Sequence, residues 1–338
     1  MKNYMFLIVS MFFLFATICC SDEDELNEIK YEHRTSKKII QILSIGNSYS
    51  QDALAYVPFI MQNMGVDVDI LIGILMQSSS SLEMHVDNFE KESNVYTFYL
   101  YNGGLSWRNY GGRTIQWALD KCNWDIVILQ QSSNAASTWS EYQPWCNKLI
   151  DYVHGYVNYP ITFVWYQPQV RPAITNDGAN WDDVTITKHY ENTTEAARRI
   201  MEETVCQAIV PVGTAIQNAR TIPSIKALGD YAHNHLNTSG FGYLEASDGV
   251  HLQEGLPCQI AAYTFVQVLL DIYGFNDYSI IGETTRVTRE WAYWKSIPGP
   301  HGDYIGSTDE NCLIAQECAI MAIEHPFEVT DMNYTINP

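Results

Sequence analysis

Five short apolar runs, separated by longer amphipathic stretches, pattern most of the chain between residues 39 and 275. The apolar runs predict β-strands at residues 39–45, 68–75, 125–129, 161–165 and 207–212. Apolar positions at helical spacing predict helices at residues 53–64, from residue 82 onward, and at residues 142–156, 188–204, 256–273 and 315–323. Strands that are nearly continuously apolar and alternate with helices indicate a parallel sheet covered by helices on both faces.

Residues 96–112 do not fit this alternation, because they are rich in aromatic residues and glycine. We interpret them as an insertion near the edge of the sheet. No repeat or internal linker divides the remainder, so we predict a single domain over residues 39–330. The polar residues 21–38 before it are typical of a tether.

Composition narrows the class of protein. The chain has 338 residues, of which 46% are hydrophobic, which is enough for a sizeable core and excludes wholesale disorder. Its 39 acidic and 19 basic residues give a formal net charge of −20. Nucleic acids and anionic lipid surfaces require clustered basic residues, so we expect neither as a partner of the folded domain.

The amino-terminal residues resemble an export signal. Lys2 precedes an apolar run at residues 4–18 that is short for a transmembrane helix and typical of a secretory signal. The run ends in Cys19-Cys20, which resembles a bacterial lipobox, and an acidic segment follows. We predict a signal peptide over residues 1–20 with lipidation of Cys20; Cys19 and a plain cleaved signal peptide are the alternatives. The acidic segment resembles the signal that places some Gram-negative lipoproteins on the outer surface, which implies a surface-exposed anchor in the outer membrane.

The cysteines of the body give no sign of a metal or redox centre. None of them forms a Cys-x-x-Cys pair, so neither a zinc ribbon nor a thioredoxin-type site is indicated. We expect most to be buried free thiols. They are Cys122, Cys146, Cys206, Cys258, Cys312 and Cys318.

A candidate nucleophile follows the first predicted strand, in the sequence Gly46-Asn47-Ser48. Gly46 permits a sharp turn, and Ser48 then lies between a strand and a helix, where backbone N–H groups can face a developing oxyanion. This is also the edge of a parallel sheet where ligands bind. Because serine and asparagine cap helices for purely local reasons, a structural role is the alternative.

A base and a carboxylate lie two hundred residues further on. Asp248 and His251 are three residues apart in a turn before the long apolar helix. A serine nucleophile needs a base to accept its proton, and the base needs an anion to hold its tautomer. Asp248 can orient His251, and His251 can face Ser48.

Two sequence blocks are therefore present: Gly46-Asn47-Ser48 after the first strand, and Asp248 with His251 near the end of the domain. In this order they resemble the SGNH (GDSL-type) hydrolases over roughly residues 39–275. More narrowly they resemble the DUF4886 branch, whose members pair Gly-Asn-Ser-x-Ser with Leu-Gln-Gln-Ser and Asp-Gly-x-His. The resemblance implies a three-layer α/β/α sandwich with a five-stranded parallel sheet of the flavodoxin-like kind. It also implies ester hydrolysis, often deacetylation of carbohydrates, without a metal or other cofactor. The catalytic roles are carried over to Ser48, Asp248 and His251.

The chain departs from that superfamily at its second and third blocks, which usually supply further oxyanion donors. A glycine is expected after the second strand, where this chain has a serine-rich turn; the N–H of Ser79 can replace it. An asparagine is expected after the third strand, where this chain has Gln130-Gln131. A glutamine amide can also donate, and we favour Gln131, with Gln130 close behind.

Three weaker candidates for substrate contact are His85, Trp165 and Trp181. The alternatives are a surface or helix-capping role for His85 and a core role for Trp165. We expect a monomeric serine esterase that acts on an acylated glycan or another small ester. The alternative is a surface glycan-binding lipoprotein that keeps the cleft but has lost the chemistry, and the altered blocks motivate it.

Overall fold

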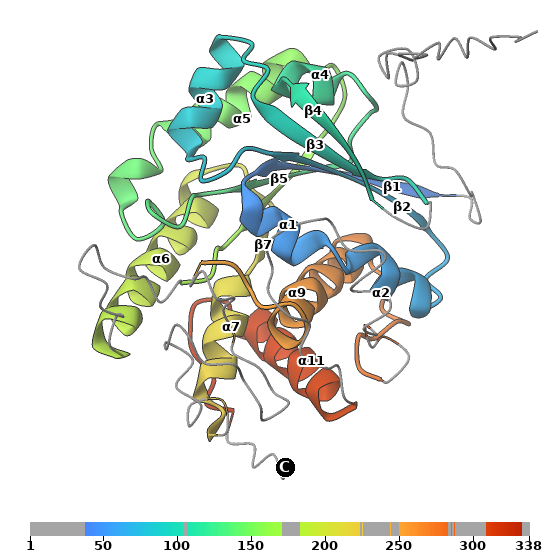
Figure 1. The fold of residues 1–338 in the computed structure, drawn as a ribbon, viewed down its shortest axis with the longest axis vertical. Helices are drawn as coiled ribbons and strands as arrows, with labels where there is room; N and C mark the ends of the chain where they lie inside the picture. Colours follow the sequence, from blue (N-terminus) through green and yellow to red (C-terminus); the bar gives the residue numbers. More distant parts are fainter. Residues whose placement is uncertain are drawn as a thin grey trace, which may run out of the picture.

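The structure is a computed structural model. It describes residues 38–103, 107–170, 183–223, 225, 244, 250–282, 285, 287 and 309–332. Within these residues the chain forms a central sheet with helices packed on both of its faces (Figure 1).

The sheet has seven strands in the order β4-β3-β2-β1-β5-β6-β7. Five of them are parallel and correspond to the predicted strands: β1 (Ile39–Gly46), β2 (Asp69–Met76), β5 (Ile126–Gln130), β6 (Thr162–Tyr166) and β7 (Ala208–Val210). Taken alone, these five follow the 2-1-3-4-5 order of flavodoxin-like sheets, and β1 is the central strand of the whole seven-stranded sheet. The carboxyl end of β1 therefore lies between those of β2 and β5.

The prediction of a sheet with only five parallel strands is wrong at one edge. Residues 96–112, interpreted as an insertion, contribute β3 (Tyr96–Tyr101) and β4 (Arg108–Arg113), and both pair antiparallel. Strand β3 alternates buried and half-buried residues, whereas β4 is mostly exposed. A hairpin can extend an edge strand without a crossover helix, which explains why this segment lacks the βα alternation.

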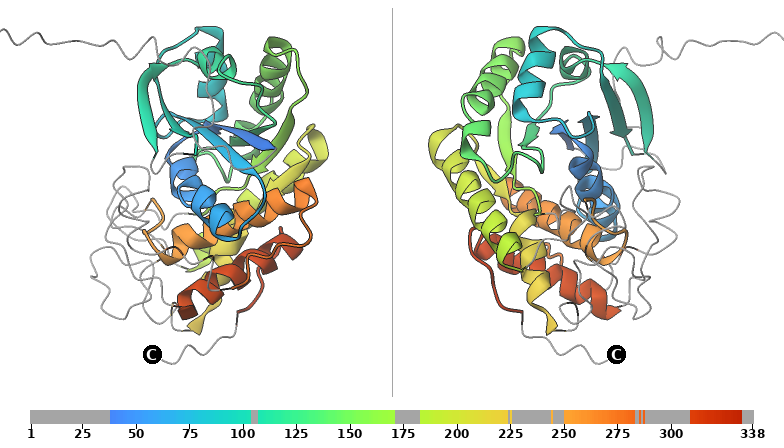
Figure 2. Two further views of the ribbon diagram at one scale, coloured as in Figure 1. Left: turned by 90° about the vertical axis from the view of Figure 1, so that its right-hand side faces the viewer. Right: turned by 60° about the vertical axis from the view of Figure 1, so that its left-hand side comes forward.

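Two hydrophobic cores lie on opposite faces of the sheet because successive strand residues point to opposite sides. In β1, Ile40 and Ile42 belong to one core, and Leu43 and Ile45 to the other. The first face is covered by α1 (Ser48–Leu54), α2 (Val57–Asn63), α7 (Val212–Thr221) and α9 (Leu256–Tyr273), and α11 (Asp309–Glu324) packs against α7 and α9. The second is covered by α3 (Leu82–Glu90), α4 (Ile115–Leu119), α5 (Trp145–Tyr156) and α6 (Asp183–Glu203). The two turned views show these layers (Figure 2).

The helix predicted at residues 53–64 is two helices, and the first begins earlier, at Ser48. Pro58 lies in the first turn of α2, where its missing N–H would have no intrahelical partner in any case. A helix that continued from α1 would need a hydrogen bond from residue 58 to the Leu54 carbonyl, and Pro58 has no N–H to donate, so the proline separates α2 from α1. Helix α1 thereby becomes a short element with Ser48 at its first position.

Helix α9 is long and apolar enough to cross a membrane by length and composition, yet 78% of it is buried inside the protein. It is the one such helix among the residues that the structure describes. Gly274, at φ 68°, ends it in the left-handed conformation that glycine favours. Helix α9 packs beside α1, α2, α7 and α11, so it forms the centre of one core.

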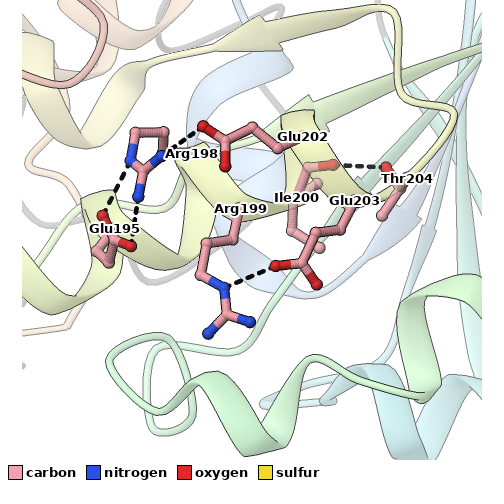
Figure 3. A network of polar contacts seen from close by, with 7 residues as sticks. All are labelled: Glu195, Arg198, Arg199, Ile200, Glu202, Glu203 and Thr204. Carbon is pink, nitrogen blue, oxygen red and sulfur yellow. Dashed lines mark hydrogen bonds and ion pairs between the residues drawn. The ribbon is translucent and has the colours of Figure 1, made fainter.

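The outer face of α6 carries a row of ion pairs (Figure 3). Arg198 pairs with Glu195 at 2.6 Å and also with Glu202, and Arg199 pairs with Glu203 at 2.8 Å. The Arg199 guanidinium additionally lies 3.9 Å from the centre of the Trp139 ring, which belongs to the short helix η1 (Trp139–Glu141) after β5. Arg199 thus joins α6 to the segment that follows β5.

The six cysteines of the body are free thiols, as expected, and all except the half-buried Cys122 are buried. Burial raises the pKa of Cys206 to about 11, so that thiol stays protonated at neutral pH.

Candidate active site

The turn after β1 is built for close packing. Gly46 ends the strand, and a Cβ at this position would lie 2.5 Å from Ser50 Oγ and 2.7 Å from Gln130 Oε1. Asn47 caps α1, and its side-chain oxygen accepts from the Tyr49 N–H at 3.1 Å. This cap fixes the start of the helix and places Ser48 at its first position.

Asn47 also joins this turn to two neighbouring strands. Its Oδ1 accepts from Gln130 Nε2 at 2.7 Å, and its Nδ2 donates to the Ser80 carbonyl at 3.1 Å. Asn47 is 3% exposed, and the other two residues are fully buried. One side chain therefore connects the ends of β1 and β5 to the turn after β2.

Ser48 and Ser79 are accessible to solvent in this region. Ser48 is partly exposed and Ser79 is exposed, at φ 57°. Neither the Ser48 hydroxyl nor the N–H groups of these two residues is hydrogen-bonded to a residue that the structure describes. Hydrogen bonds from Gln77 N and Ser80 Oγ to the Gly46 carbonyl, both 3.2 Å, hold the two turns together.

His251 lies next to α1. Its ring meets the ring of Tyr49 edge-on, with the centroids 6.4 Å apart. The next residue, Leu252, donates its N–H to the Asp52 carboxylate of α1 at 3.0 Å. The structure thus brings His251 beside the helix that begins with Ser48, without a direct hydrogen bond between the two side chains. Asp248 lies outside the described residues.

Gln130, the last residue of β5, and Gln131, the next residue, point to opposite faces of the sheet. Gln130 is on the α1 side, where its Oε1 accepts from Ser50 Oγ and its Nε2 donates to Asn47. Gln131 is on the other side, where its amide bonds Leu82 N, Ser132 N and the Glu141 carbonyl at 2.6–3.2 Å. The structure therefore places Gln130, not the favoured Gln131, beside the Ser48 turn. The twofold alternation of strand residues is the physical reason.

His85 is not open to a substrate, because it is fully buried. Its Nδ1 lies 2.8 Å from Tyr96 Oη and its Nε2 lies 3.1 Å from Ser80 Oγ. The single proton of the Ser80 hydroxyl is shared between the Gln77 carbonyl at 2.8 Å and the Gly46 carbonyl at 3.2 Å, so His85 must donate from Nε2 and accept at Nδ1. Burial lowers the pKa of His85 from 6.5 to about 3, which keeps the ring neutral. His85 braces the turn that carries Ser79.

Trp165 also belongs to the core, since it is fully buried in β6 against Tyr142, with ring centroids 5.6 Å apart. A cleft-lining role for Trp165 is therefore wrong, because neither ring face reaches the surface. Trp181 lies outside the described residues, and so do Cys19 and Cys20.

Reasoning from the sequence did not identify two buried polar residues of this region. Asp52 is 2% exposed, and Gln169, three residues beyond β6, is 1% exposed. Tyr166 Oη lies 3.0 Å from Gln169 Oε1 and 3.4 Å from the Tyr49 carbonyl. For Asp52 the position four residues after Ser48 was a usable signal, because it places both on one helix face. For Gln169 no such pattern exists.

Among the residues that the structure describes, no group of three or more His, Cys, Asp or Glu side chains is placed to hold a metal ion. The region therefore combines a partly exposed serine hydroxyl, two backbone N–H groups that bond no described residue, and a nearby imidazole. These groups suit nucleophilic attack by the hydroxyl.

The fold and this turn define the protein as an α/β protein with a partly exposed serine directly after its central strand. The sequence profile of the family described as "Domain of unknown function (DUF4886)" matches residues 41–269, and the chain belongs to this family. No curated protein matches the chain.

A solved structure of the same family shares the fold, and two other solved structures have a weaker similarity. A DUF4886 family protein from Bacteroides uniformis ATCC 8492 is 24% identical, with a TM-score of 0.66 over 87% of this chain and 98% of that one. A proposed SGNH hydrolase from Slackia heliotrinireducens is 16% identical, with a TM-score of 0.40 over 69% of this chain and all of that one. A gut microbial diltiazem-metabolizing enzyme is 12% identical, with a TM-score of 0.34 over 74% and 49% of the two chains. The last two likenesses are distant and support no argument about chemistry.

Proposed function

We propose that this protein is a serine esterase of the SGNH type that removes acyl groups, acetyl groups first among them, from carbohydrates. The observation that carries the proposal is the position of His251 beside α1, whose first residue is the partly exposed Ser48. Chain segments separated by two hundred residues meet at the carboxyl edge of a parallel sheet, where ligands bind in such folds.

In the proposed reaction, His251 takes the proton of Ser48 as the Ser48 oxygen attacks the ester carbonyl. The N–H groups of Ser48 and Ser79 donate to the oxyanion of the tetrahedral intermediate. The intermediate collapses, and the alcohol leaves with the proton that His251 holds. Water, deprotonated by His251, then attacks the acyl-serine ester and releases the acid and free Ser48. Asp248 holds the imidazolium in this scheme, a role that rests on the resemblance to SGNH hydrolases.

The buried groups support this scheme by positioning. Gln130 holds Asn47, Asn47 holds the Ser80 carbonyl, and His85 holds the Ser80 hydroxyl. Both proposed N–H donors therefore belong to turns that are fixed by buried hydrogen bonds. Donors that are fixed before the reaction need no reorganisation when negative charge develops, which is the basis of electrostatic catalysis.

A fluorophosphonate probe and a chromogenic acetyl ester test the proposal together. We expect labelling and hydrolysis by the parent and neither by Ser48→Ala, with unchanged circular dichroism because the Ser48 hydroxyl bonds no described residue. Removal of a catalytic serine typically lowers kcat by about 10⁴-fold or more. A Ser48→Ala protein that hydrolyses as fast as the parent would show that Ser48 is not the nucleophile.

The second candidate is a glycan-binding protein without catalysis. It is favoured by the backbone hydrogen bonds of the Gln131 amide, which occupy the side chain expected to donate to an oxyanion. Absence of labelling, together with binding to an acetylated polysaccharide panel, would support it over the esterase.

We also propose that the protein is lipid-anchored through Cys20 on the outer surface of the outer membrane. The lipobox-like sequence and the acidic residues after it motivate this. Cys20→Ala should move the protein from the membrane fraction to the soluble fraction. Protease sensitivity of intact cells tests the surface location.

A further inference from the structure

Asp52 is a buried carboxylate that the proposed chemistry does not use. It lies on α1 with 2% of its surface exposed, four residues after Ser48. With 3.6 residues per turn, positions four apart lie on the same helix face. Asp52 therefore lies one turn below the proposed nucleophile, on the same side of α1.

A hydrogen-bond partner of Asp52 comes from the segment that carries His251. Asp52 Oδ2 accepts from Leu252 N at 3.0 Å, across 200 residues of sequence. A hydrogen bond from a backbone N–H to a carboxylate is stronger than one to a neutral acceptor. Because Leu252 is fully buried, water does not compete for this bond.

The peptide on the other side of Leu252 is held as well. Cys258 Sγ lies 3.7 Å from the Leu252 carbonyl and donates to it. Burial, with the charge of Asp52 as a smaller cause, raises the pKa of Cys258 well above its usual value, so the thiol keeps the proton that it donates. Leu252 is thus fixed between α1 and α9, and the Tyr49 ring meets the neighbouring imidazole edge-on.

We propose that Asp52 is a positioning residue that fastens the His251 segment to the helix carrying Ser48, so that nucleophile and base move as one unit. This inference rests on the proposed function. It predicts that loss of the Asp52–Leu252 bond displaces the imidazole and slows proton transfer without weakening substrate binding. A displacement of about 1 Å in an active site can lower the rate by about a hundredfold.

Three variants test the inference by kinetics on the acetyl ester. Asp52→Ala removes the acceptor, and we expect kcat to fall by about ten- to a hundredfold with little change in KM. Asp52→Asn keeps an acceptor of the same shape but without charge, and we expect an intermediate kcat, because charge-assisted hydrogen bonds are roughly twice as strong. The matched control is Asp125→Asn, whose carboxylate accepts from Gln41 N at 2.8 Å in the amino-terminal half of β1. It should retain the parent kcat.

A measurement that does not depend on activity separates this inference from the proposed function. In protein labelled with ¹⁵N-histidine, the His251 ring signals are those lost in His251→Asn. Asp52→Ala, or Asp52→Asn if the alanine variant does not fold, should shift or broaden these signals and leave those of His85 unchanged. If the parent neither hydrolyses esters nor reacts with the probe, the esterase proposal fails while these spectra still test Asp52. The positioning role would be overturned if both variants kept the His251 signals and the kcat of the parent. If only Asp52→Asn folds, the same result in that variant would overturn it.

Discussion

Gln130 Nε2 donates to Asn47 Oδ1 across 2.7 Å, and this hydrogen bond joins the ends of two neighbouring strands beneath the Ser48 turn. The residues are 83 positions apart in sequence, and both are buried. Since Asn47 also caps α1 and binds the turn after β2, the position of Ser48 depends on this bond.

Replacement of Gln130 should therefore affect catalysis more than replacement of Gln131. Gln130→Glu places a second oxygen against Asn47 Oδ1 where a donor is required, and we expect kcat/KM to fall by about tenfold or more, since an unmade buried hydrogen bond costs about 1–3 kcal/mol. Gln131→Glu should lower the midpoint of thermal unfolding and change kcat/KM less. Steady-state kinetics and calorimetry on both variants test this, and a larger kinetic effect at Gln131 would contradict it.

Gly46→Ala should destabilise the protein. The added methyl group would lie 2.5 Å from Ser50 Oγ and 2.7 Å from Gln130 Oε1, both of which belong to a buried network. Overpacking of this kind typically costs about 1–3 kcal/mol. Gly155→Ala is a control of opposite sign: it lies in α5 with open space around the new Cβ, and it should stabilise the helix by about 0.5–1 kcal/mol. Denaturant unfolding of both variants measures the two effects.

His85 should make stability depend on pH. Its pKa is about 3 in the folded protein and about 6.5 when unfolded, so the unfolded chain binds a proton first as pH falls. Stability from this group is complete above pH 6.5 and is lost toward pH 3, by about 2 kcal/mol between pH 7 and pH 5. We expect His85→Gln to be less stable than the parent at pH 7 but to lose less stability on acidification. Parallel curves of unfolding free energy against pH would contradict this.

The ion pairs on α6 should contribute unequally (Figure 3). Arg198 bonds only exposed glutamates of its own helix, so Arg198→Ala should leave the unfolding midpoint within experimental error. Arg199 also lies over the Trp139 ring, so Arg199→Ala should lower the midpoint measurably. Thermal unfolding of the two variants under identical conditions makes the comparison.

The sequence was sufficient to predict the five parallel strands, because runs such as residues 39–45 are mostly apolar, with apolar residues on both faces that require burial. It also pointed to Ser48, because a glycine and a serine after a buried strand are recognisable locally. The hairpin of β3 and β4 was missed, since its strands lack the pattern of the others and depend on the free edge of β2.

Tertiary structure alone decided which side chains meet. Whether Gln130 or Gln131 lies beside Ser48 depends on which face of the sheet each side chain occupies. A shift of one residue in the register of β5 would exchange the two faces. The burial of His85 and Trp165 depended on the elements packed over them. The bond between Asp52 and Leu252 joins segments 200 residues apart, and no local pattern encodes such a contact. Secondary structure follows from the short-range periodicity of apolar residues. The site arises from packing between distant segments, and the pattern of residues adjacent in sequence does not specify that packing.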